Sequence, residues 1–141
     1  MKSLKKQRMF TLIEMVMVIV IIAMLAALVG PNIYKKFAKA SKASTKAQIK
    51  SIADAVFDYK LDTGKFIDSG VGLEELVRNV SGNQKWDGPY LNAQKLPKDA
   101  WGNEYIYVRP GQNGTQFDII SYGADGQPGG EGDAADITNW D

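Results

Sequence analysis

The sequence contains no cysteine and no histidine. Without cysteine the chain has no disulfide framework, no thiol nucleophile and no thiolate metal site. Without histidine it also lacks the commonest general base and the usual protein ligand for zinc or iron. Together these two absences argue against an enzyme.

Positive charge is scarce in the distal part of the chain. Residues 51–141 carry seven basic and fifteen acidic side chains, although the net charge of the whole chain is +1. Residues 1–8 carry four positive charges, and residues 31–50 carry six lysines and no acid. An acidic distal domain is a poor nucleic-acid binder, so we expect no nucleic-acid partner, whereas a cation is a plausible ligand.

One long apolar run, Phe10–Val29, dominates the N-terminal part and contains a single charged residue, Glu14. A helix of about twenty residues crosses the ~30 Å hydrocarbon core of a bilayer. A cleavable signal peptide is the alternative, but its apolar region is ordinarily shorter, and a helical pattern follows this run. The sequence therefore predicts a retained membrane helix in contact with lipid. Basic residues flank both of its ends, so charge alone does not fix its orientation.

A second helical segment follows the pair Gly30-Pro31, where we expect a kink or local unwinding. Its predicted apolar stripe consists of Ile33, Phe37, Ala40, Ser44, Ala47, Ile52, Val56 and Tyr59. A basic stripe runs opposite, at Lys35, Lys39, Lys42, Lys46 and Lys50. That stripe is either a solvated face, a contact with lipid phosphates near Lys35 and Lys36, or a partner for Asp54, Asp58 or Asp62 of an adjacent subunit.

The remaining residues predict one small domain. Gly64 is placed to end the long helix, and residues 71–77 predict a short helix. Residues 105–108 and 116–120 predict two strands joined by a hairpin-like loop at 110–114. We therefore expect a small antiparallel sheet packed on the C-terminal half of the long helix. We also expect the three tryptophans to fill the core of this domain or its edges.

The last segment, residues 121–140, is rich in glycine and carries four carboxylates within twelve residues. Ca²⁺ prefers six to eight hard oxygen ligands and tolerates irregular geometry. Neither the EF-hand spacing nor the glycine-rich nonapeptide spacing fits this segment. Its composition alone leaves two alternatives open, a metal site and a solvated acidic loop.

The N-terminal sequence KKQRM-FTLIEMVMVIVIIAMLAALVGPN resembles the leader and first helix of type IV pilins and pseudopilins. The resemblance implies that a prepilin peptidase cuts between Met9 and Phe10 and that Phe10 is then N-methylated. The family has Gly where this chain has Met9. The resemblance also implies that Glu14 pairs with the free amine of Phe10 in a neighbouring copy during assembly; the alternative is a carboxylate that stays hydrated near the membrane edge.

The distal motifs D-A-W-G-N-E-Y at 99–105, D-I-I-S-Y-G-A-D-G at 118–126 and D-I-T-N-W at 136–140 are similar to the major pseudopilins of the bacterial type II secretion system. The resemblance implies that the last loop binds Ca²⁺ through Asp side chains and main-chain carbonyls. The side chains would be those of Asp125 and Asp136, with Asp133 replacing a second adjacent Asp that many members have. Tyr122 and Gln127 would contribute carbonyl oxygens.

The expected fold is α+β: a long N-terminal transmembrane and stalk α-helix with a small C-terminal antiparallel β-sheet domain. Its expected segments are a leader at 1–9, a membrane helix at 10–30, a stalk helix at 31–62 and a periplasmic domain at 63–141. The resemblance implies a homopolymeric, non-enzymatic subunit of the inner membrane that works with a prepilin peptidase, minor pseudopilins and an inner-membrane assembly platform. The alternatives are another pilin-like subunit and a membrane-anchored calcium-binding domain that never polymerises.

Overall fold

The computed structural model describes residues 9–141. Its main element is α1, a helix of 52 residues that runs from Leu12 to Thr63. The chain divides into two units, the first ending at Phe37 and the second comprising Ala38–Asp141. Each unit is described separately, and the C-terminal part of α1 belongs to the second.

The first unit is an apolar helix whose side chains are exposed throughout its described residues. An 18-residue window of α1 has a mean hydropathy of 3.0, and none of that window is buried. By length and composition the helix is therefore able to cross a membrane. The helix is unbroken through Pro31, so the local unwinding expected at Gly30-Pro31 is wrong. A proline removes only its own N–H from the helical ladder, and the hydrogen bonds on either side of it remain.

The end of α1 is the one expected at Thr63-Gly64. The Gly64 N–H donates to the Lys60 carbonyl at 2.8 Å, and Gly64 has a φ of 80°. This is the left-handed position that glycine occupies at helix C-termini. The hydroxyl of Thr63 donates to the Tyr59 carbonyl at 2.7 Å and closes the last turn.

The buried face of α1 differs from the predicted stripe in its first half. The buried helix residues are Ala38, Ser41, Thr45, Ile49, Ile52, Ala55, Val56, Tyr59 and Thr63. Phe37, Ala40, Ser44 and Ala47 are exposed, so only the predictions from Ile52 onward are confirmed. The predicted stripe placed small apolar residues inward, but Thr45 is buried because its Oγ1 accepts a hydrogen bond from the Ala100 N–H at 3.2 Å.

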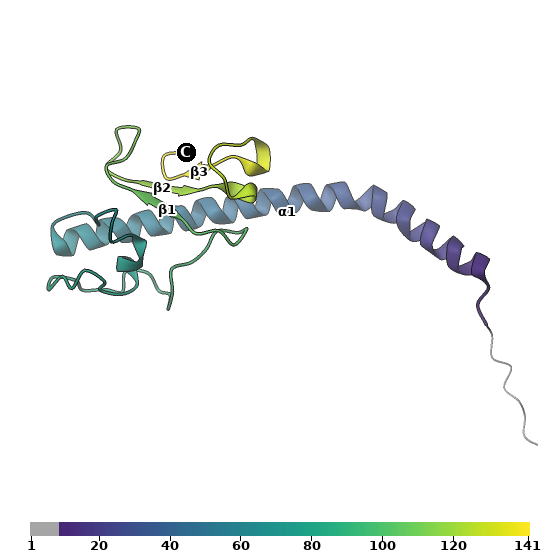
Figure 1. Ribbon diagram of the computed structural model, residues 1–141, viewed down its shortest axis with the longest axis horizontal. Helices are drawn as coiled ribbons and strands as arrows, with labels where there is room; N and C mark the ends of the chain where they lie inside the picture. The colour runs from purple at the N-terminus through teal and green to yellow at the C-terminus, as the bar shows by residue number, and fades with distance from the viewer. Residues whose placement is uncertain (1–8) are drawn as a thin grey trace, which may run out of the picture. The chain divides into compact units, whose positions relative to one another are not determined.

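The sheet has three antiparallel strands in the order β1-β2-β3, lying beside the C-terminal half of α1 (Figure 1). β1 spans Ile106–Val108, β2 spans Asp118–Ser121 and β3 spans Ile137–Thr138. β1 and β2 are the two predicted strands, both shorter than expected, with Tyr107 opposite Ile119. β3 was not predicted, because two residues are too few to show an alternating pattern.

Three short 3₁₀ helices complete the described structure: η1 at Leu73–Leu76, η2 at Gly123–Asp125 and η3 at Gly132–Ala134. η1 is the short helix expected over 71–77, shorter than predicted and of the 3₁₀ type. It is held by Glu75, whose carboxylate accepts hydrogen bonds from the Val80 and Ser81 N–H groups and the Ser81 hydroxyl. Glu75 is fully buried, so this local network turns the chain immediately after η1.

The core of the second unit lies between α1, η1 and the sheet. Ile49, Ile52, Val56, Leu76 and Ile119 are each at most 1% exposed. Trp86 and Trp101 pack against this core as expected, whereas Trp140 is 39% exposed and lies outside it.

Side chains complete the hydrogen bonding beyond the strand ends. Beyond β3, the Asn139 side chain accepts from the Ile119 N–H at 2.8 Å and donates to the Phe117 carbonyl at 3.2 Å. Beside the end of β1, the Ser69 hydroxyl accepts from the Arg109 N–H at 2.8 Å and donates to the Arg109 carbonyl at 3.0 Å. In both places a side chain takes the role of a missing strand.

Candidate assembly helix and acidic loop

The predicted processing residues, Met9 and Phe10, precede α1 and are 86% and 77% exposed. The rest of the predicted leader, residues 1–8, lies outside the described part of the chain. An exposed peptide ahead of the first helical turn is accessible to a peptidase.

Glu14, which we expect to pair with the Phe10 amine of a neighbouring copy, caps the N-terminus of its own helix in this structure. Its Oε2 accepts from the Thr11 N–H at 2.7 Å and from the Thr11 hydroxyl at 3.0 Å. The Glu14 N–H donates to Thr11 Oγ1 at 3.3 Å, which makes a reciprocal capping box. The spacing T-x-x-E at 11–14 signals this cap in the sequence. The Glu14 carboxylate, although it lies in an apolar segment, therefore has hydrogen-bond donors within its own chain. Its pairing with the Phe10 amine of a neighbouring copy stays a prediction.

The acidic loop begins at a buried hydrogen-bond network around Asp99. Asp99 Oδ1 accepts from the Asn103 N–H at 2.8 Å and the Trp101 N–H at 3.0 Å. Its Oδ2 accepts from the Ser121 hydroxyl, at the end of β2, at 2.6 Å. The Asn103 side chain then donates to the Gly123 carbonyl at 2.9 Å. The turn at 99–103 therefore holds the first residues of the loop.

Gly123 sits where the two ends of the loop meet. Its φ is 66°, and a β-carbon added there would lie 2.8 Å from the Ala135 carbonyl oxygen and 3.0 Å from that of Asp133. Two backbone carbonyls therefore converge on the glycine. From the helix side, Lys42 Nζ donates to the Gly132 carbonyl at 2.9 Å.

The predicted calcium ligands occupy different positions around this loop. Asp125 lies in η2 and is exposed, and its Oδ1 accepts from the Gln127 N–H at 3.1 Å. Tyr122 precedes η2 and is half-buried, and Asp133 lies in η3. Across residues 9–141 no three acidic side chains are close enough together to form a metal-binding group.

Asp136 is the ligand candidate with an unsatisfied atom. Its Oδ2 accepts from the Gly129 N–H at 3.0 Å, but its Oδ1 is buried without a hydrogen-bond partner. An unpartnered buried carboxylate oxygen is costly and is commonly explained by a missing ion or water. The oxygen is therefore available to a cation.

Sequence reasoning missed the residues that shape the loop without supplying carboxylates, namely Lys42, Asn103 and Gly123. Lys42 and Asn103 are distant from the loop in sequence, so nothing in their local pattern connects them with it. The glycine content of the loop predicted sharp turns but not the particular glycine at which the two ends meet.

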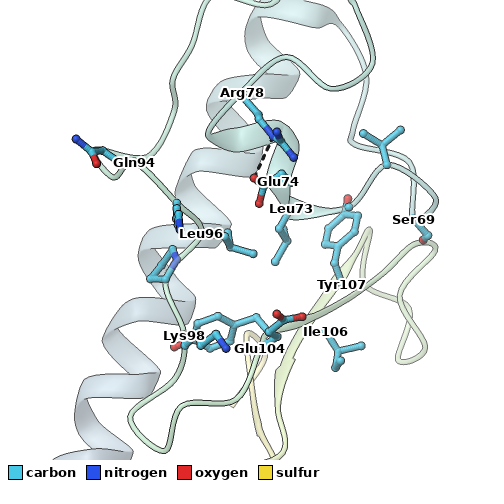
Figure 2. A pocket seen from close by; sticks show the side chains of 15 residues that line it. Ser69, Leu73, Glu74, Arg78, Gln94, Leu96, Lys98, Glu104, Ile106 and Tyr107 are labelled. Atoms are coloured by element: carbon cyan, nitrogen blue, oxygen red, sulfur yellow. Dashed lines mark ion pairs between the residues drawn. The ribbon is translucent and has the colours of Figure 1, made fainter.

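A separate groove of about 780 Å³ lies between η1, the segment 94–98 and β1 (Figure 2). Glu74 and Arg78 pair at 3.1 Å on one wall, and Lys98 and Glu104 line another part. None of the predicted site residues lines this groove.

Comparisons with known proteins agree with this arrangement. Residues 32–140 match the family described as type II secretion system (T2SS), protein G, and residues 4–30 match the prokaryotic N-terminal methylation motif. The chain is 46% identical to a type II secretion system core protein G of Pseudomonas aeruginosa, over 97% of each chain. It is 42% identical to that of Vibrio cholerae, over 99% of this chain and 96% of the relative.

A solved structure supports the same conclusion. The crystal structure of the major pseudopilin from the type 2 secretion system of enterohaemorrhagic Escherichia coli matches with a TM-score of 0.62 and 32% identity, covering 78% of this chain and 95% of that one. The predicted α+β fold is thereby confirmed. An apolar N-terminal helix, a three-stranded sheet on its C-terminal half and near full-length relatives together show that the chain belongs to the protein G family of the type II secretion system, the family of the major pseudopilins.

Proposed function

We propose that this structural secretion subunit polymerises through α1 into a periplasmic filament after removal of residues 1–9. One observation carries the proposal: the 18-residue apolar window of α1 has no buried residue within its own chain. Outside lipid, such a surface is stable only when other apolar surfaces cover it, and identical helices of further copies provide them.

Before assembly the same surface lies in the bacterial inner membrane, with the second unit in the periplasm. The partners are then further copies of the chain, the prepilin peptidase, minor pseudopilins and the inner-membrane assembly platform. Contacts between copies that do not close into a ring generate a helical filament.

Mass spectrometry of the full-length protein purified from its host membranes tests this function. A mass that starts at methylated Phe10, together with filaments visible by electron microscopy, supports it. An intact N-terminus and a chain that stays monomeric in the presence of all other secretion components would favour the non-polymerising membrane anchor instead.

Ca²⁺ stabilisation of the acidic loop is the second part of the proposal. The unpartnered Oδ1 of Asp136 is a hard oxygen donor of the kind that Ca²⁺ prefers. Binding would draw together the carboxylates of Asp125, Asp133 and Asp136, which lie apart in the described structure, with the carbonyls of Tyr122 and Gln127. The bound cation would neutralise the carboxylates and cross-link the two ends of the loop.

Thermal unfolding of the full-length protein in detergent, with CaCl₂ or EDTA, tests the metal site. A ligand at one hundred times its Kd stabilises the folded state by about 2.7 kcal/mol, so Ca²⁺ should raise the Tm by several degrees. Asp125→Ala and Asp136→Asn should abolish this rise. Glu131→Ala, which removes an exposed acid of the same loop from outside the proposed set, should preserve it. Equal melting of the unmodified protein in CaCl₂ and EDTA would refute the site.

A further inference from the structure

The second unit carries an ordered row of charges on α1. Six charged side chains occur at intervals of four residues, three lysines followed by three aspartates: Lys42, Lys46, Lys50, Asp54, Asp58 and Asp62. Side chains four residues apart on a helix lie next to one another and form a ridge. This ridge, which we term the charge row, winds around α1, so that its lysines at the start and its aspartates at the end face different sides of the helix.

The charge row is not neutralised by ion pairs within residues 9–141. The ion pairs found in residues 9–141 join Lys65 to Asp68, Arg78 to Glu74 and Arg109 to Asp68, and none involves the row. Lys42 is half-buried and donates to the Gly132 carbonyl. The five other members are exposed, so their charges are available to a partner.

A hollow borders the row. A groove of about 520 Å³ lies between α1 and residues 138–141, and Lys46, Lys50 and Asp54 form part of its wall. The helix side of the groove also carries Ala43, Ala47 and Ala53, whose small side chains let another backbone approach closely. The charges therefore lie beside a surface that the α1 helix of a neighbouring copy can approach closely.

We infer that the charge row joins successive copies of this chain in register, an inference that rests on the proposed polymerisation. A parallel copy displaced by twelve residues, or ~18 Å along the helix, and turned about its own axis brings Lys46 and Lys50 opposite Asp58 and Asp62. Each copy then uses its lysines toward one neighbour and its aspartates toward the other. This head-to-tail contact does not close, so it propagates along a filament.

An antiparallel pair of rows is equally complementary, because Lys46 would also face Asp58 in a closed dimer. Copies anchored in one membrane by the same N-terminal segment run in the same direction, which selects the parallel arrangement. The two arrangements differ in outcome, since the parallel one gives chains of copies and the antiparallel one stops at two.

Charge reversal in the full-length protein, expressed with its secretion components, tests the contact. Lys46→Asp with Lys50→Asp places aspartate opposite aspartate, and Asp58→Lys with Asp62→Lys places lysine opposite lysine. Each double variant should reduce the filament yield by about tenfold or more. The four changes combined restore opposite charges at both positions and should return the yield to within about twofold of the unmodified protein.

A matched control applies the same change of charge elsewhere. Lys85→Asp with Lys95→Asp alters two exposed lysines outside the row and should leave filaments unchanged. Equal Tm values for all the variants show that each one folds. Normal filaments from both double variants, or a combined variant that is no better than either, would overturn the inference. If the unmodified protein forms no filaments, it is the proposed function that fails.

Cross-linking tests the displacement itself, because the chain contains no native cysteine. Lys46→Cys with Asp58→Cys, treated in filaments with a short bismaleimide, should give a ladder of trimers and larger species. Either cysteine alone should give no cross-linked species. A product that stops at the dimer, or dimers from one cysteine alone, would overturn the parallel twelve-residue displacement.

Discussion

Replacing Asp99 by alanine should destabilise the second unit more than any exposed acidic substitution. The carboxylate of Asp99 is 5% exposed and accepts three hydrogen bonds, from Trp101, Asn103 and Ser121. These contacts join the turn at 99–103 to the end of β2. Removing the carboxylate also leaves the fully buried hydroxyl of Ser121 without its acceptor.

The expected loss follows from these contacts. A hydrogen bond to a charged group contributes about 1.5–3 kcal/mol, and part of that sum is offset because a carboxylate no longer has to be buried. We therefore expect Asp99→Ala to lower the free energy of unfolding by about 3–4 kcal/mol. For a unit of this size that corresponds to a Tm decrease of roughly 12–16 °C.

Urea unfolding of the full-length protein in detergent, followed by tryptophan fluorescence, measures this loss, since Trp101 donates directly to Asp99. Ser121→Ala removes one hydrogen bond of the three, together with the acceptor of the Gly123 N–H, and should lose about 1.5–3 kcal/mol. Asp87→Ala removes an exposed acid outside the network and should stay within about 0.5 kcal/mol of the unmodified protein. An Asp99→Ala variant as stable as Asp87→Ala would refute the role of this network.

Two further predictions concern the loop junction and the sheet. Gly123→Ala combines a positive φ with a β-carbon 2.8 Å from the Ala135 carbonyl oxygen, so urea unfolding should show a loss of about 2 kcal/mol or more. Gly82→Ala has a φ of 68° but open space around it, and should lose only about 1 kcal/mol; equal losses would contradict the close approach at Gly123. Burial raises the pKa of Tyr107 to about 12. The unfolded chain releases this phenolic proton near pH 10 while the folded chain retains it, so stability should fall as the pH rises from 10 to 12. Tyr107→Phe should make that fall shallower, and an identical pH profile would contradict the assignment.

The apolar N-terminal part of α1 and the two longer strands were predictable because each depends on a local pattern. The apolar run at Phe10–Val29 spans several turns of α1, and the alternation around Tyr107 and Ile119 marks β1 and β2. The end of α1 was predictable from Gly64, because glycine adopts the left-handed conformation without strain.

The buried face of the stalk was not predictable from hydrophobicity, because its first half is polar. Ser41 and Thr45 are buried, whereas the more apolar Phe37 is exposed. Thr45 can be buried because its hydroxyl has a partner distant in sequence, the Ala100 N–H. β3 depends in the same way on residues of β2 that precede it by some seventeen positions.

The acidic loop was predictable in composition but not in arrangement. Its carboxylates and glycines are evident in the sequence, yet only the structure shows that Asp136 keeps an unpartnered buried oxygen while Asp125 is exposed. The glycine count alone did not distinguish Gly123, where two carbonyls approach closely, from Gly129, where nothing does.

The amide of Asn139 has a consequence for how copies of this protein can associate. Because it occupies the N–H of Ile119 and the carbonyl of Phe117, a foreign strand cannot add to β2 at that point. Ser69 similarly engages both backbone groups of Arg109 beside β1. At these two positions the sheet is therefore closed to the backbone pairing between copies that builds amyloid.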